Sequence, residues 1–262
     1  MTKKEQEKPC NDSILRACYI LDLFTVENDK WILRDIAAKC GISPTTAIPV
    51  LRSLEKCGYL ERDPETKQYS LGIRFLEKSQ IKINSMNIID ISAKVLKNFS
   101  KKYSVNTHLG RLEGGDVIYL DRHEAVVHSL SPSYVGKRIP AYCSSMGKAL
   151  LAHLEYGDLI ELLRTYPIRK ITFNTKTEVD EIVEELKETL ARGYAIDDEE
   201  YQARGYCIAV PIYDVSGRVC AAISCSTTKT PENMKNIPTL QKAMIDAGKE
   251  ISAALGYGCL YE

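Results

Sequence analysis

The sequence predicts an α+β protein of two domains, an N-terminal winged helix-turn-helix and a C-terminal domain with a central antiparallel sheet. Three observations lead to this prediction. Two short helices flank a tight glycine turn; two short strands around a proline-containing turn follow; and from residue 105 on come strands, helices, strands again and a closing helix. With 262 residues, each domain can bury its own core. We place the winged helix-turn-helix at residues 10–72, a linker helix at 73–86 and the second domain at 87–262.

Apolar residues at helical spacing predict three helices in the first domain. The first, over residues 12–24, carries one apolar stripe that can close a three-helix core. The second ends at Gly41, a natural helix terminator. Ser43 and Pro44 then open a third helix, because serine is a good N-cap and proline is tolerated at the first helical position. Gly58 ends that helix.

A β-hairpin wing is expected next, with strands at 59–62 and 67–71 around the turn at 63–66. A helix pair of this kind places its second helix where it can enter a DNA major groove, so the sequence predicts contact with DNA. A protein-docking module could use the same elements. The preceding helix, which completes a three-helix core, favours DNA binding.

The second domain is expected to alternate between helical and extended segments. After the linker helix, expected at 73–84, a helix at 87–103 opens the second domain, and its lysines are expected to be solvated rather than bound to DNA. A glycine turn at 113–116 predicts a hairpin. The remaining expected elements are strands at 107–112, 117–122, 125–130, 194–197, 207–213 and 218–226, and helices at 144–154, 156–164, 178–192 and 237–255.

Composition places the chain among globular proteins of the cytoplasm. Apolar residues make up 44% and charged residues 27%, and no apolar run approaches the roughly 20 residues that span a bilayer. The N-terminus is charged and has no apolar segment typical of a signal peptide. The nine cysteines have no paired spacing, so we expect them to be reduced and to bind no structural zinc. We therefore expect no membrane contact.

Charge is balanced overall, at 35 basic and 35 acidic residues, and also within residues 1–70. A neutral DNA-binding domain makes few favourable phosphate contacts per protomer. Because a dimer doubles those contacts, we expect the chain to act as an oligomer.

The second domain has polar segments typical of a ligand pocket. A small-residue loop before residue 145 offers N–H groups at a helix start, where anions bind. An acidic run at 196–200 follows a strand. Ser224 and Ser226 share one face of a strand, Cys225 points to the other, and Cys207 could face the same space as the serines. No nucleotide-binding signature and no clear acid–base pair are present, so the sequence predicts binding without catalysis, with no catalytic residue, metal ligand or cofactor.

The chain resembles the isocitrate-lyase-regulator (IclR) family of bacterial transcription factors from about residue 12 to 255. Each motif is weak alone, but the ordered set is specific to the family. The motifs include Arg16-Ala17-x-x-Ile20-Leu21, Asp35-Ile36-Ala37, Tyr69-x-Leu71-Gly72, Ser145-Met146-Gly147-Lys148-Ala149, Gly193-Tyr194-Ala195-x-Asp197 and Cys207-Ile208-Ala209-x-Pro211.

This resemblance implies a GAF-like effector-binding domain behind the winged helix and linker helix. It also implies dimers, often paired into tetramers, on pseudopalindromic double-stranded DNA operators. A small organic acid, such as a small carboxylate, or an aromatic compound would bind the second domain and alter operator binding. Matched by motif, the effector-binding residues are Ser145, Met146, Asp197, Cys207, Ser224 and Ser226.

Two positions depart from the family pattern. Pro49 stands where recognition helices of the family usually carry arginine, and it should kink or distort the helix. Met146 stands among residues that are often smaller in the family, which makes the pocket smaller or more apolar. The residues expected to contact DNA are Lys39, Thr45, Thr46, Ile48 and Arg52.

Two alternatives remain open from the sequence. One is a degenerate enzyme or metal-binding domain fused to a weakened winged helix. The other is a redox sensor that uses Cys207 or Cys225.

Overall fold

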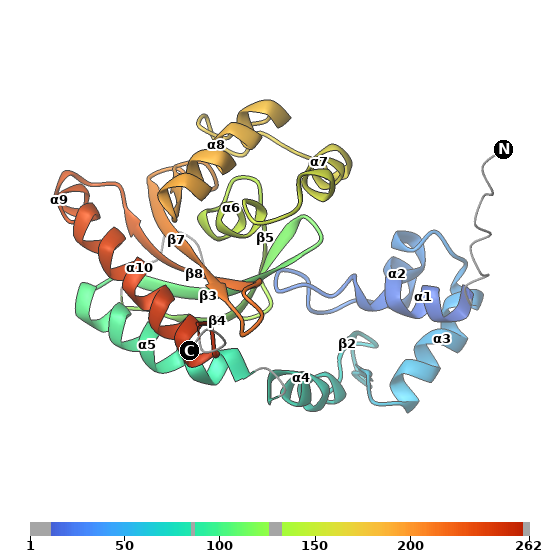
Figure 1. Cartoon of the computed structure of the whole chain (residues 1–262). Helices are drawn as coiled ribbons and strands as arrows, with labels where there is room; N and C mark the ends of the chain where they lie inside the picture. The colour runs from blue at the N-terminus through green and yellow to red at the C-terminus, as the bar shows by residue number, and fades with distance from the viewer. Residues whose placement is uncertain (1–11, 85–86, 126–132, 259–262) are drawn as a thin grey trace. The chain divides into compact units, whose positions relative to one another are not determined.

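The computed structural model describes residues 12–84, 87–125 and 133–258 and divides the chain into two compact units, residues 1–85 and 86–262 (Figure 1). The first unit has the predicted winged helix-turn-helix. Its elements are α1 (Asp12–Leu21), α2 (Leu33–Lys39), α3 (Pro44–Lys56), β1 (Leu60–Arg62), β2 (Tyr69–Leu71) and α4 (Arg74–Asn84).

Three helices and the hairpin of the first unit share one apolar core. Ile20, Ile36, Ala47 and Leu51 are fully buried where α1, α2 and α3 meet. Trp31 pairs with Tyr69 of β2 as an isolated antiparallel bridge, which ties the wing to the segment before α2. α1 ends three residues before the predicted end of the first helix.

The helix α3 begins as the sequence predicts and continues through Pro49. The Ser43 hydroxyl accepts a hydrogen bond of 3.1 Å from the N–H of Thr46, and Pro44 occupies the first turn. The helix does not end at Pro49; it runs on to Lys56. Proline has no N–H, so the Thr45 carbonyl four residues earlier receives no backbone hydrogen bond from this position.

The second unit is built on a six-stranded antiparallel sheet in the order β5-β4-β3-β8-β7-β6. Its strands are β3 (Asn106–Glu113), β4 (Asp116–His123), β5 (Arg138–Pro140), β6 (Ala195–Asp198), β7 (Gly205–Tyr213) and β8 (Val219–Thr228). Its helices are α5 (Asn87–Tyr103), α6 (Ser145–Leu151), α7 (Tyr156–Thr165), α8 (Val179–Arg192), α9 (Pro231–Lys235) and α10 (Ile237–Ala254).

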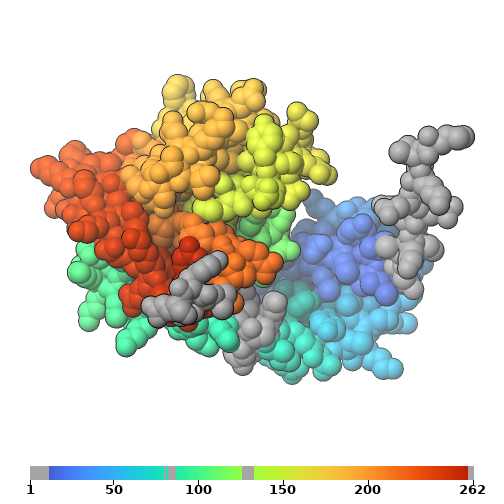
Figure 2. All heavy atoms as spheres, viewed as in Figure 1, coloured from blue at the N-terminus to red at the C-terminus, as the bar shows by residue number. Residues whose placement is uncertain are grey.

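Helices cover both faces of this sheet (Figure 1). On one face, α5 and α10 pack against a branched apolar layer that includes Ile208, Val210 and Ile223. On the other face, α6 packs over the small residues Ala209 and Ala222, with α7 and α8 outside it. The space-filling view shows the residues of α7 and α8 next to one another on the outer surface (Figure 2). This arrangement is consistent with the expected GAF-like domain.

Two short elements differ from the sequence prediction. Most of the strand expected at 125–130 lies outside the described residues. On the edge away from β3, β4 pairs with β5, a strand that was not predicted. Residues 138–140 are extended because they pair with residues 116–118. The short helix α9 was not predicted; it begins at Pro231, and the Thr230 hydroxyl caps it.

Candidate functional site

Strand pairing gathers polar side chains in a row across four adjacent strands. Asp197 of β6 lies opposite Cys207 of β7, Cys207 opposite Ser226 of β8, and Ser226 opposite Asn106 of β3. Directly paired residues project from the same face of a sheet. This row, which we call the polar row, lies on the face that α6 covers, beside the alanines at which α6 packs.

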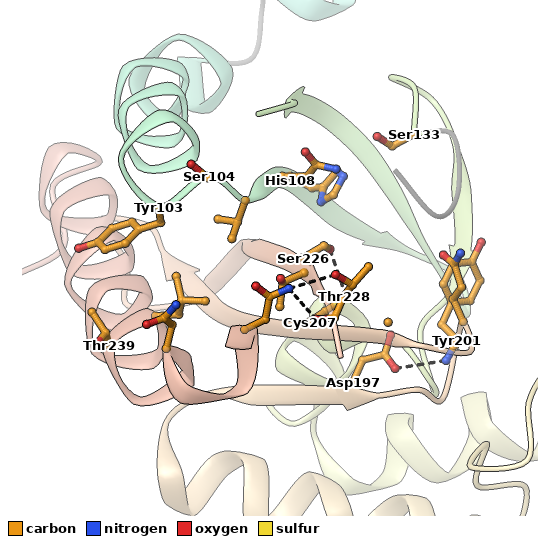
Figure 3. A pocket seen from close by; sticks show the side chains of 18 of the residues that line it. Tyr103, Ser104, His108, Ser133, Asp197, Tyr201, Cys207, Ser226, Thr228 and Thr239 are labelled. Carbon is orange, nitrogen blue, oxygen red and sulfur yellow. Dashed lines mark hydrogen bonds between the residues drawn. The ribbon is translucent and has the colours of Figure 1, made fainter. Parts of the chain in front are cut away.

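The polar row forms part of the wall of a cavity of about 550 Å³ (Figure 3). His108 and Tyr119 lie beside it on β3 and β4, and Tyr201 follows β6. The end of α5 and the start of α10, which pack on the other face of the sheet, line the cavity at the sheet's edge. The cavity therefore opens at the end of the sheet where β3 and β7 begin and β8 ends.

Asp197 is the buried carboxylate that faces this cavity, and the exposed Glu232 of α9 lines it as well. Asp197 is 4% exposed, and its Oδ1 accepts hydrogen bonds from the N–H groups of Glu200 at 2.8 Å and Tyr201 at 3.2 Å. Burial raises the pKa of Asp197 to about 7, although both N–H groups and the charge of Lys148 act in the opposite direction. Within the described part of the chain, Oδ2 has no hydrogen-bond partner.

Tyr119 and His108 supply neutral polar groups to the same cavity. Their rings lie 4.8 Å apart between centroids. Burial lowers the pKa of His108 to about 4, so the imidazole is neutral at pH 7. The Tyr119 side chain is 8% exposed, and among the described residues its hydroxyl has no hydrogen-bond partner. Burial also raises the pKa of this hydroxyl, which keeps it a donor.

Cys207 contributes a neutral thiol rather than a nucleophile. Its Sγ lies 3.1 Å from Oγ of Ser226. Loss of hydration raises the pKa of the Cys207 thiol far above its usual range, so little reactive thiolate forms at pH 7. Cys225 packs in the apolar layer under α5 and α10, as the sequence predicts, and burial raises its pKa to about 12.

Two lysines line the cavity at its solvent side. Lys137 is half-buried, and its Nζ lies over the Tyr201 ring, 6.0 Å from the centroid. It is also close enough to His108 to lower the pKa of the imidazole. Lys102, at the end of α5, is exposed. The positive charges of the wall are thus at the mouth, whereas Asp197 is buried.

The six residues matched to an effector site by motif are divided by the structure. Asp197, Cys207 and Ser226 line the cavity. Ser224 lies two residues before Ser226 on the same face of β8, with Oγ 3.5 Å from Nδ1 of His108. Ser145 and Met146 are buried in α6 and are not among the residues that line this cavity.

Packing explains the position of the α6 start. The Ser144 hydroxyl already accepts a hydrogen bond of 3.2 Å from the N–H of Gly147. The Met146 sulfur fills the space above Gly110, where an added Cβ would lie 3.2 Å from it.

The side chains that sequence reasoning missed are His108, Tyr119, Tyr201 and Lys137. They reach the cavity through strand pairing and loop closure, which no local motif signals.

A cluster of buried charges lies behind Asp197. Lys148 of α6 is 1% exposed, and its Nζ lies 2.5 Å from Oε1 of Glu200 and 3.5 Å from Oε1 of Glu185. Burial raises the pKa of Glu200. Burial alone would also raise that of Glu185, but Lys148, Lys176 and Arg192 lower it to about 2. The Glu200 N–H bonds Asp197, so this cluster supports the loop that holds the cavity carboxylate.

The predicted DNA-contacting residues lie on and before α3. Thr45, Arg52 and Lys39 are exposed, and Thr46 and Ile48 are half-exposed. The hydroxyls of Thr45 and Thr46 lie 2.7 and 2.8 Å from Oγ of Ser43. The first turn of α3 therefore presents hydroxyls held in place by its own cap.

The described residues contain no group of three or more His, Cys, Asp or Glu side chains that could hold a metal ion. They also contain no helix long and apolar enough to cross a bilayer.

Comparisons with known proteins agree with both halves of the chain. The IclR helix-turn-helix domain matches residues 13–64, and the family described as bacterial transcriptional regulator IclR C-terminal matches residues 80–253. The HTH-type transcriptional regulator XynR of Escherichia coli (strain K12) is 31% identical over 249 residues, which cover 95% of this chain and 99% of XynR.

Solved structures give the same result for the fold. The crystal structure of Thermotoga maritima IclR is 28% identical, with a TM-score of 0.74, and the match covers 94% of this chain and 99% of that one. An IclR homologue from Microbacterium hydrocarbonoxydans, complexed with 4-hydroxybenzoate, has a TM-score of 0.81 at 23% identity, over 93% of this chain and 98% of that one. The chain therefore belongs to the IclR family of transcriptional regulators, DNA-binding proteins with a helix-turn-helix domain and a C-terminal effector-binding domain.

Proposed function

We propose that this protein regulates transcription by binding an operator through α3 and a small acid in the cavity of the second unit, without catalysing a reaction. The observation that carries the proposal is the cavity itself. Its wall presents two polar groups, Oδ2 of Asp197 and the Tyr119 hydroxyl, to which no described residue hydrogen-bonds. An acceptor and a donor are therefore available there to a ligand.

The size and chemistry of the cavity support a small organic acid as its ligand. Its volume of about 550 Å³ lies in the range of small-molecule sites. A structural relative binds 4-hydroxybenzoate, and an aromatic or aliphatic acid of that size would fit here. The neutral Cys207 thiol gives no support to the redox alternative.

On the operator side, we propose that Thr45, Thr46 and Ile48 read bases, with Lys39 and Arg52 on phosphates. Residues of a recognition helix near its N-terminus are the ones that reach base edges in the major groove. The exposed first turn of α3 supports this assignment.

We further propose that the protein acts in the cytoplasm as a homodimer or tetramer. α1 carries an exposed apolar face, with Ile14 63% and Tyr19 59% exposed and Leu15 beside them. Neighbouring exposed apolar residues on one helix favour burial against another surface, and a second copy would also double the contacts to DNA.

The proposal is tested with an operator selected by the wild-type protein from random DNA. The double variant Thr45→Ala/Thr46→Ala should bind it at least tenfold more weakly, since a good base contact contributes roughly 1–3 kcal/mol. Ser53→Ala, which removes another exposed hydroxyl of α3, is the control. Fluorescence anisotropy gives the affinities, and unchanged binding by the double variant would refute the recognition-helix assignment.

A further inference from the structure

The charges around the cavity restrict how an acid can lie in it. Asp197 is buried on the sheet, whereas Lys137 lies at the mouth beside the Tyr201 ring. Lys148 acts on Asp197 at longer range, but its Nζ is 2.5 Å from Glu200, and it does not line the cavity. The exposed Glu232 also lines the cavity, so the solvent side carries two lysines and one glutamate, whereas the buried charge is that of Asp197.

From this arrangement the geometry points to a hydroxylated monocarboxylic acid as the effector, with its hydroxyl group donating to Asp197 and its carboxylate directed toward Lys137. This inference rests on the proposed effector function and names the ligand class and its orientation. It makes Asp197 the residue that selects for a hydroxyl group.

While Asp197 is ionised, as it mostly is at pH 8.0, the carboxylate of the ligand can face it only at a penalty. Two like charges a few ångströms apart repel strongly where water is excluded. At the mouth, Lys137 offers an opposite charge in a partly hydrated position. A dicarboxylate, whose second charge would reach the polar row, is disfavoured for the same reason.

The polar row favours a hydroxyl group as the inner end of the ligand. Oδ2 of Asp197 is an acceptor without a partner among the described residues, and a hydroxyl group is a donor of matching size. The Tyr119 hydroxyl, likewise without a partner there, can donate to the ligand oxygen in return. A site built to bond a hydroxyl group discriminates strongly against the analogue that lacks it.

The test compares matched acids that differ only in hydroxyl groups. The probes are 4-hydroxybenzoate against benzoate, lactate against propionate, and gluconate against hexanoate. Isothermal titration calorimetry on the full-length protein at pH 8.0 gives the dissociation constants, under conditions where Asp197 is mostly ionised. We expect the hydroxylated member of at least one pair to bind roughly tenfold or more tightly.

Two variants locate the ends of the ligand. Asp197→Asn should remove most of the hydroxyl preference without loss of the acid site. Lys137→Met should weaken both members of a pair by a similar factor, since it removes the partner of the shared carboxylate. Lys101→Met, an exposed lysine of α5 outside the cavity wall, is the control and should bind as the wild type does.

The possible results distinguish failure of this inference from failure of the proposed effector function. Acids that bind without hydroxyl preference, or a preference that survives in Asp197→Asn, would overturn the inference and leave the effector function standing. Failure of all six acids to bind natively folded protein would overturn the proposal that this cavity is an acid-binding site.

Discussion

Replacing Lys148 with methionine removes the only cation that contacts Glu200 in the described structure. Nζ of Lys148 lies 2.5 Å from Oε1 of Glu200, a side chain that is 7% exposed. Breaking a buried ion pair by removing one partner typically destabilises a protein by about 3–5 kcal/mol. Glu185 keeps two other partners, Lys176 at 2.6 Å and Arg192 at 2.8 Å. The variant therefore leaves Glu200, rather than Glu185, without a contacting cation.

Because Glu200 can be protonated, the stability lost in Lys148→Met has an upper limit. A carboxyl group with an ordinary pKa of about 4.5 requires about 4 kcal/mol to be protonated at pH 7.5, and about 1.4 kcal/mol at pH 5.5. The folded variant can therefore be destabilised by about 3–4 kcal/mol at pH 7.5. The loss of stability should be smaller at lower pH. The pKa of Glu200 is higher in the folded state than in the unfolded state, so the folded state binds the proton more tightly.

Urea unfolding followed by far-ultraviolet circular dichroism measures this change at both pH values. The single tryptophan, Trp31, belongs to the first unit, so its fluorescence reports separately on a part of the chain that lacks the cluster. Lys187→Met is the control, because Lys187 pairs with Glu184 on the surface. The double variant Lys148→Met/Glu200→Gln should recover part of the stability. A deficit below about 1 kcal/mol at pH 7.5, or one that is equal at pH 5.5, would refute the reasoning.

Three further predictions concern the helix α6, the cavity and the helix α3. Gly147→Ala should lower the melting temperature sharply in a thermal-unfolding scan, since the new Cβ would lie 2.1 Å from the Ala141 carbonyl oxygen; Gly157→Ala, with open space around it, should leave it unchanged or raise it. The affinity for 4-hydroxybenzoate should fall as the pH falls from 8 to 6, because a hydroxyl group that donates to ionised Asp197 lowers the pKa of this carboxyl, about 7 in the free protein, and binding then releases a proton. Calorimetry in buffers of different ionisation enthalpy measures that release, and its persistence in Asp197→Asn would contradict the assignment. Pro49→Arg should tighten DNA binding and steepen its salt dependence by about one unit, as one added phosphate contact does; an unchanged slope would place residue 49 away from the DNA backbone.

Long elements with a strong apolar period were predictable from the sequence, and short ones were not. α5 and α8 span several turns and bury one clear stripe each, so their positions follow from helical spacing alone. β5 and α9 are only three and five residues long. Their conformations depend on a paired strand or a cap, which local apolar spacing does not reveal.

Some cavity residues could be predicted from the sequence of one strand, whereas others depend on how distant strands pair. Alternation along one strand places Ser224 and Ser226 on one face, whereas the acidic run alone did not say which carboxylate turns inward, and Asp197 followed from the family motif. Tyr119 and His108 could not be found in this way, because strand order decides which side chains lie beside β8. Ser145 and Met146 followed from family motifs, and their burial here depends on how closely α6 packs over Gly110.

The polar row also constrains how the sheet assembles. A slip of β8 by one residue would turn Ser224 and Ser226 into the apolar layer under α5 and α10, and would expose Ile223 and Cys225 to the cavity. Each hydroxyl buried there without a partner would lower stability by roughly 1–3 kcal/mol. The side chains proposed to bind the effector thus penalise wrong strand alignments during folding. A substitution that makes the cavity apolar, such as Ser226→Val, would remove part of that penalty and permit misaligned sheets even where it leaves the native fold stable.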